Sequence, residues 1–154
     1  MSSQTVAQKR LAGATLGLYL LFLAWVFLWP SAGPASTSVD KTLQWLWDAG
    51  FSTDLVTGPR VEFVLNALML APVPILATLA GARWSWERWT AYAFVAASTV
   101  ELFQGVALPN RSAQFQDIAS NTAGALVGAV LSHLVLTVTS RVRQDGGAQG
   151  SRRR

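Results

Sequence analysis

The sequence has no cysteine and a single histidine, and these absences exclude several kinds of site. Without cysteine there can be no disulfide, no thiolate-bound metal and no cysteine nucleophile. The one histidine, His133, offers no basis for a histidine-ligated metal site or a Ser-His-Asp triad. Glycine patterns of the kind that cradle nucleotide phosphates are also missing. We therefore expect no metal and no cofactor.

Charged residues are scarce as well. They make up 13% of the 154 residues, whereas 51% are hydrophobic. A soluble domain carries about 25% charged residues, so a membrane protein is the first interpretation, with the lipid bilayer as its surroundings. The net charge of +4 would suit nucleic-acid binding, but most Lys and Arg residues flank apolar segments instead of forming a basic stripe. Nucleic acid is not an expected partner.

Four apolar segments follow one another along the chain. The first, residues 11–29, has no charged residue, and as a helix it would be about 28 Å long, enough to cross the hydrocarbon core. A signal peptide cleaved near Ala35 is the alternative for this segment, although the apolar run exceeds the usual length of about 7 to 15 residues. In the second segment, Pro72 and Pro74 predict a kink. The later segments span about residues 61–80, 89–108 and 118–138.

These segments predict an all-α protein, a polytopic membrane four-helix bundle. Residues 11–140 would form the membrane domain, after a cytoplasmic N-terminus at residues 1–10. Residues 141–154 are polar and rich in Arg and Gly, so we expect a disordered basic cytoplasmic tail.

The polar stretch between the first two segments predicts a short interfacial helix. Ser38 would be its N-cap and Gly50 its stop. Trp45 and Trp47 suit the headgroup level of a membrane, where tryptophan is common.

The basic residues indicate the orientation. Three of the twelve, Lys41, Arg60 and Arg111, would lie on one side of the membrane, and the other nine would share the opposite side. Because cytoplasmic loops carry the excess of Lys and Arg, both termini are expected in the cytoplasm. The nine are Lys9, Arg10, Arg83, Arg88, Arg141, Arg143, Arg152, Arg153 and Arg154.

Polar residues interrupt the outer ends of the last three segments. Spacings of three or four residues place those of one helix on one face. On the fourth segment this face continues inward as Gly124 and Gly128, a G-x-x-x-G pattern that allows close approach of a neighbouring helix. His133 lies about 24 Å along this helix from Asp117, so it cannot join them. The outer polar residues are Glu62, Asn66, Glu101, Gln104, Arg111, Asp117 and Asn121.

These seven residues need a role, because charge inside a membrane is costly unless it is paired or hydrated. Arg111 is the cation that would offset Glu101 and Asp117. In one interpretation the charged residues form an ion network that fixes the hairpin, with the amide side chains as hydrogen-bond partners between helices. In the other, all seven line an outward-facing pocket for a polar headgroup or sugar at the outer leaflet.

The same residues resemble a known family. E-L-F-Q from Glu101, then L-P-N-R ending at Arg111, then D-I-A-S-N-T-A-G-A-L-V-G from Asp117 are similar to the VanZ-like family of small bacterial integral membrane proteins. A weaker similarity covers E-F-V-L-N-A-L-M-L-A-P, which begins at Glu62. Family members often show D-K-x-x-H after the first helix, and here Gln44 stands in place of the histidine.

The resemblance implies a four-helix protein of the bacterial cytoplasmic membrane that acts in the cell envelope, with no established reaction. The namesake of the family is an accessory factor in low-level resistance to the glycopeptide antibiotic teicoplanin. Antibiotic resistance, a lipid-linked or glycopeptide ligand and an envelope protein partner are therefore expectations.

Three functions remain open. The first is a non-enzymatic accessory protein that binds a lipid-linked or glycopeptide-like ligand in the polar pocket. An enzyme acting on a lipid-linked headgroup would use Glu101 as general acid or base and Arg111 to hold phosphate. A structural helix bundle serving a partner protein would use the same side chains for packing alone.

Overall fold

The computed structural model describes residues 3–29, 33–108 and 114–151, with side chains described for residues 6–29, 33, 36–108 and 114–137. All regular secondary structure in these residues is helical, so the predicted all-α class is confirmed. The helices are α1 (Ser3–Phe27), α2 (Gly33–Asp48), α3 (Gly58–Leu70), α4 (Pro72–Ala80), α5 (Trp86–Ala107) and α6 (Phe115–Ser151).

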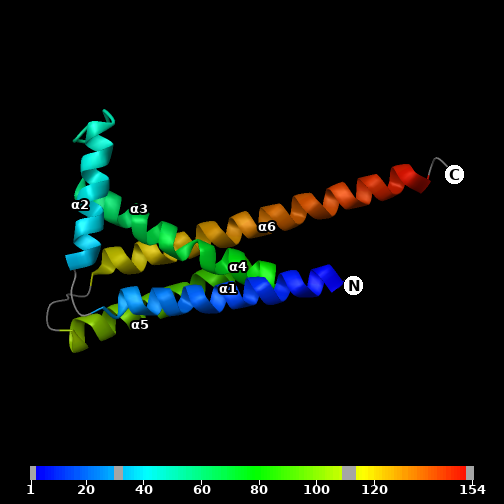
Figure 1. Ribbon diagram of the computed structural model, residues 1–154, viewed down its shortest axis with the longest axis horizontal. Coiled ribbons are helices and arrows are strands. Elements are labelled where there is room, and N and C mark those ends of the chain that lie inside the picture. Colours follow the sequence, from blue (N-terminus) through cyan, green and yellow to red (C-terminus); the bar gives the residue numbers. More distant parts are fainter. Residues whose placement is uncertain (1–2, 30–32, 109–113, 152–154) are drawn as a thin grey trace.

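The helices are arranged mostly side by side. Figure 1 shows α1, α4, α5 and α6 running along the long axis of the molecule, with α3 inclined to them. α6 packs against α3, α4 and α5, and α1 packs against α4. α2 packs on α3 and stands crosswise to the long axis at the end opposite the two chain termini, with part of its length projecting beyond the other helices. We call these two ends the α2 end and the terminal end.

Three helices of the described chain are long and apolar enough, by length and composition, to cross a membrane. They are Val6–Phe27, Gly58–Ala80 (α3 with α4) and Phe115–Thr137. Many of their large apolar side chains point outward, as expected where lipid is the surrounding solvent. α5 is of similar length, 22 residues, but Glu101 and Gln104 make it less apolar. These features indicate a helical membrane protein.

Small residues fill the places where the helices meet. Gly124 and Gly128 of α6 lie against the backbone of Ala67 and Ala71. A Cβ atom added to Gly124 would lie 2.7 Å from the Ala67 Cα atom, and one added to Gly128 would lie 2.8 Å from the Pro74 Cγ atom. Membrane helices depend on such close fit, since lipid supplies no hydrophobic force between them. The buried alanines are Ala77, Ala97, Ala125 and Ala129.

The second apolar segment is interrupted at Ala71, between α3 and α4. Pro72 and Pro74 have no N–H, so the carbonyls four residues earlier lose their helical donors. Ala71 itself keeps helical backbone angles, and its N–H donates to the Ala67 carbonyl at 3.1 Å. The kink expected from the prolines corresponds to this interruption.

Two boundaries differ from the sequence predictions. α2 begins at Gly33, so Ser38 lies inside the helix and its assignment as N-cap is wrong. Pro34 suits the first turn, whose N–H groups have no helical acceptor. α6 continues to Ser151, so residues 141–151 are helical where a disordered tail was expected. Extending an existing helix costs less than nucleating a new one. Gly50 follows α2 with a φ of 90°, as a helix stop requires.

Charged residues gather at the terminal end. Gly81 ends α4 with a φ of 112°, and the Lys9 side chain lies 3.8 Å from the position a Cβ atom would take there. Glu87 stands in the first turn of α5, before the apolar run. Its pKa is lowered from the usual value, chiefly by a hydrogen bond with the Ser85 side chain and to a smaller degree by His133. An ionised Glu87 suits contact with water at this end.

Candidate functional site

A cavity of about 540 Å³ lies at the α2 end, between α1, α2, α3, α5 and α6. Its volume falls within the range of small-molecule sites, roughly 300 to 1,000 Å³. Arg111 of the predicted site lies outside the described residues. The other six predicted polar residues all line the cavity: Glu62, Asn66, Glu101, Gln104, Asp117 and Asn121.

The deepest of these residues form what we call the polar floor. Glu101 and Gln104 of α5 are each 3% exposed, and Asn121 of α6 is 6% exposed. Glu62, at the start of α3, is partly exposed. The helix ends therefore supply a polar surface below the α2 end, deep enough to be shielded from water.

Two carboxylates of the cavity have fixed donors. The Asn66 side-chain amide donates to Asp117 Oδ1 at 2.9 Å and so connects α3 to α6. The backbone N–H of Gln114 donates to Glu101 Oε2 at 2.8 Å, which connects the start of α6 to α5. Hydrogen bonds to ionised groups are stronger than neutral ones, so these contacts position both carboxylates.

Two further hydrogen bonds hold α1 beside the cavity. The Gln104 Nε2 group donates to the Phe27 carbonyl at 2.6 Å. This carbonyl is at the last residue of α1, where carbonyls have no donor within the helix. Lower on α1, the Tyr19 hydroxyl donates to the Met69 carbonyl of α3 at 2.8 Å.

Asn121 differs from its neighbours in one respect. Its Oδ1 atom is buried and accepts no hydrogen bond from the described residues. A buried acceptor without a donor costs about 1 to 3 kcal/mol, so such atoms call for an explanation. Because Asn121 lines the cavity, a group within the cavity can supply that donor.

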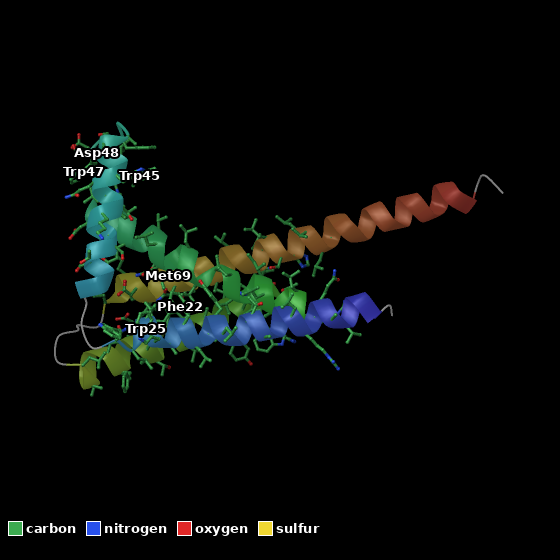
Figure 2. All side chains as sticks on the ribbon, in the orientation of Figure 1. Phe22, Trp25, Trp45, Trp47, Asp48 and Met69 are labelled. Atoms are coloured by element: carbon green, nitrogen blue, oxygen red, sulfur yellow. The ribbon has the colours of Figure 1, made fainter. Side chains whose placement is uncertain are left out.

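Sequence reasoning missed the opposite side of the cavity, an aromatic wall on α1. Tyr19, Phe22, Trp25 and Trp29 all line the cavity, and neighbouring ring centroids lie 6.0, 6.2 and 5.2 Å apart. Figure 2 shows Phe22 and Trp25 on the side of α1 that faces Met69. Spacings of three, three and four residues place all four rings on one helix face, and this is the sequence signal that could have found the wall.

The remaining predicted residues lie away from the cavity. Gly124 and Gly128 continue the Asn121 face of α6 toward the terminal end, where they pack on α3 and α4. His133 is exposed and does not line the cavity.

The apolar helices and the polar cavity at one end of them define a helical membrane protein with an internal polar site. A model of the VanZ/LLP1 family matches residues 16–136, and the chain belongs to this family. The resemblance based on the Glu101-to-Gly128 motifs is thereby confirmed. Comparisons with curated proteins and with solved structures gave no significant match.

Proposed function

We propose that the protein crosses the bacterial cytoplasmic membrane four times, with both termini in the cytoplasm and the α2 end outside. α4 ends at Ala80, and Gly81 after it lies beside Lys9 at the terminal end, whereas α6 starts at the cavity. If the three apolar helices cross the membrane, α5 must cross it too in order to join these two points. Its 22 residues extend about 33 Å. The excess of basic residues at the terminal end supports the orientation.

Labelling of single cysteines tests this topology, because the natural chain has no cysteine background. Asp48 of α2 and Ser85 before α5 are both exposed. We expect a membrane-impermeant maleimide to label Asp48→Cys in intact cells and Ser85→Cys only after the membrane is opened. The reverse pattern would rule out the orientation, and labelling of both in intact cells would show that α5 does not cross.

We further propose that the cavity binds the polar head of a lipid-linked or glycopeptide-like ligand at the outer leaflet. The protein would thus be an accessory or binding protein of the cell envelope. The observation that carries the proposal is convergence: six polar side chains from three helices line one cavity, and one of them, Asn121, offers an unused acceptor. Family membership makes teicoplanin one glycopeptide to examine.

Glu101→Gln and Arg111→Ala, each at wild-type abundance, test the proposal. Wild-type protein in nanodiscs of bacterial polar lipid extract should retain a polar-headed lipid, or teicoplanin when it is added, detected by native mass spectrometry. We expect Glu101→Gln to reduce retention about tenfold or more, because hydrogen bonds to charged groups contribute roughly 1.5 to 3 kcal/mol. Thr99→Val is the control, since the Thr99 hydroxyl bonds only within α5. Equal retention in all variants would remove the binding proposal.

A second candidate function rests on Glu101, whose nearly buried carboxylate lies on the cavity floor. There it could act as general acid or base on a lipid-linked headgroup, with Arg111 holding phosphate. The same nanodiscs distinguish the two functions, because an enzyme would convert a lipid of the extract into a new species. An unchanged lipid composition after prolonged incubation would exclude this candidate.

The hydrogen bonds between helices favour a third candidate, a structural bundle that serves an envelope protein partner. Asn66 and Gln104 each connect two helices. A purely structural role predicts that the polar variants lose protein abundance while the remaining molecules retain full activity. Loss of ligand at normal abundance would contradict it.

A further inference from the structure

The cavity has an opening on its side as well as a polar floor. Four large apolar lining residues are also exposed: Phe22 by 45%, Trp25 by 59%, Trp29 by 40% and Leu68 by 62%. A side chain that both lines a cavity and meets the surroundings marks its mouth. Phe22 and Trp25 belong to α1 and Leu68 to α3, and both helices belong to apolar segments long enough to cross a membrane. The mouth therefore faces the level of the lipid chains.

The lining that α1 and α3 contribute is mainly apolar near the mouth, whereas Glu62 and Asn66 of α3 add polar groups toward the α2 end. α1 packs mainly on α4, toward the terminal end, and the Tyr19 hydroxyl bond to Met69 joins α1 to α3 below the mouth. Between that bond and the α2 end, the lining of these helices includes Val26 and Leu65. A hydrocarbon chain at Phe22, Trp25 and Leu68 would meet apolar side chains, and burying an unpaired polar group is the main cost of moving into an apolar site.

The α2 side of the cavity is partly covered. Ser38 and Val39 of α2 contribute to the lining, and Figure 1 shows α2 crosswise to the long axis at this end, with part of its length projecting beyond the other helices. A ligand from the bilayer meets the mouth directly.

The polar floor favours a ligand whose head group can donate a hydrogen bond. Asn121 Oδ1 is a buried acceptor that lacks a partner among the described residues. A hydroxyl or amide group of a ligand head can donate to it, whereas a choline head has no donor. The rings of Trp25 and Trp29 offer flat apolar surfaces with a polar N–H at the edge, which suit a sugar or polyol with apolar faces and a hydroxyl rim.

We propose, building on the proposed function, that the ligand is a hydroxyl-headed membrane lipid that enters sideways from the outer leaflet. Its chain lies between α1 and α3 at Phe22, Trp25 and Leu68, and its head donates a hydrogen bond to Asn121 Oδ1.

The test uses the full-length protein in phosphatidylcholine nanodiscs with three probes. These are digalactosyl diacylglycerol, its water-soluble head digalactosylglycerol, and excess phosphatidylcholine with the same acyl chains. Native mass spectrometry measures the molecules retained per protein. We expect wild type to retain about tenfold more galactolipid than phosphatidylcholine per mole of each lipid present, from the hydrogen bonds of its head. The soluble head should not displace it.

Two variants address the two parts of the proposal. Asn121→Leu should abolish the preference for galactolipid, with Ser132→Ala as control, because Ser132 is a buried α6 residue whose hydroxyl bonds Gly128 within its own helix. Leu68→Trp should block the mouth and lower retention of both lipids. Leu79→Trp is its matched control, since Leu79 is 60% exposed on α4 and does not line the cavity.

Each contrary result has a distinct meaning. If digalactosylglycerol binds as well as the lipid, or Leu68→Trp behaves like Leu79→Trp, sideways access is wrong while the binding function stands. If both lipids are retained equally, recognition of a hydroxyl head is wrong. If neither galactolipid nor soluble head binds and Glu101→Gln matches wild type for every envelope lipid, the proposed function fails as well. If Asn121→Leu does not fold, Leu68→Trp still tests the proposal. Leu68 is exposed, so its replacement should leave folding unchanged.

Discussion

The pair Gly124→Ala and Gly128→Ala should destabilise the protein by about 2 to 6 kcal/mol, taking 1 to 3 kcal/mol for each overpacked position. At Gly124 the new methyl group would meet the Ala67 backbone, with the Cα and carbonyl carbon atoms at 2.7 Å. At Gly128 it would meet the Ala71 carbonyl carbon at 2.9 Å. Backbone atoms of a packed helix cannot swing aside as a flexible side chain can, so α6 must move away from α3 and α4. Thermal unfolding in detergent micelles measures the loss.

Gly17→Ala on α1 is the matched control. Nothing lies within 4 Å of the Cβ atom it would add. Alanine favours a helix over glycine by about 1 kcal/mol, so this variant should unfold at the same temperature or slightly higher. The gain in helix propensity applies to all three glycine positions. The difference in unfolding temperature between the paired variant and Gly17→Ala therefore reports the packing of α6 against α3 and α4. Similar unfolding of the paired variant and the control would show that the close approach contributes nothing.

The double variant Tyr19→Phe with Gln104→Met removes both hydrogen bonds that join α1 to α3 and α5. We expect the half of α1 nearer the α2 end to open more often from the bundle. Tyr19→Phe leaves the Met69 carbonyl without its donor, and Gln104→Met does the same to the Phe27 carbonyl. We expect a combined cost of about 2 to 4 kcal/mol, since each change removes a hydrogen bond and leaves an acceptor unpaired. Both replacements keep the side-chain size, so the effect reports on polar contacts.

Hydrogen exchange of α1 amides measures this release. Exchange at residues 19–27 should accelerate in the double variant, while residues toward the N-terminus of α1, which pack on α4, should stay protected. Thr99→Val, which removes a hydroxyl bonded only within α5, should leave exchange of α1 unchanged. Exchange of α1 at the wild-type rate in the double variant would mean that apolar contacts alone hold the aromatic wall in place.

Much of the architecture could be predicted from local chemistry. An apolar run without charge has few options other than a membrane helix, so composition and length were enough to predict the first, second and fourth segments. The spacing of Asp117, Asn121, Gly124 and Gly128 placed them on one helix face, because 3.6 residues make one turn. The same spacing rule grouped Glu101 with Gln104. Helix ends were less predictable: α2 begins earlier than expected and α6 continues further, since terminal turns depend on small differences in free energy.

Periodicity says which residues share a face, but it does not say what that face meets. Nothing in the chain order states that Gly124 contacts Ala67, or that Asn66 donates to Asp117 across 51 positions of sequence. The aromatic residues of α1 fit a lipid-facing surface as well as a cavity wall, because both are apolar. Whether polar residues from three helices enclose a space or pack solidly depends on how the helices cross. The way the helices cross is set by the close packing of the whole bundle, and it places these polar side chains around one cavity.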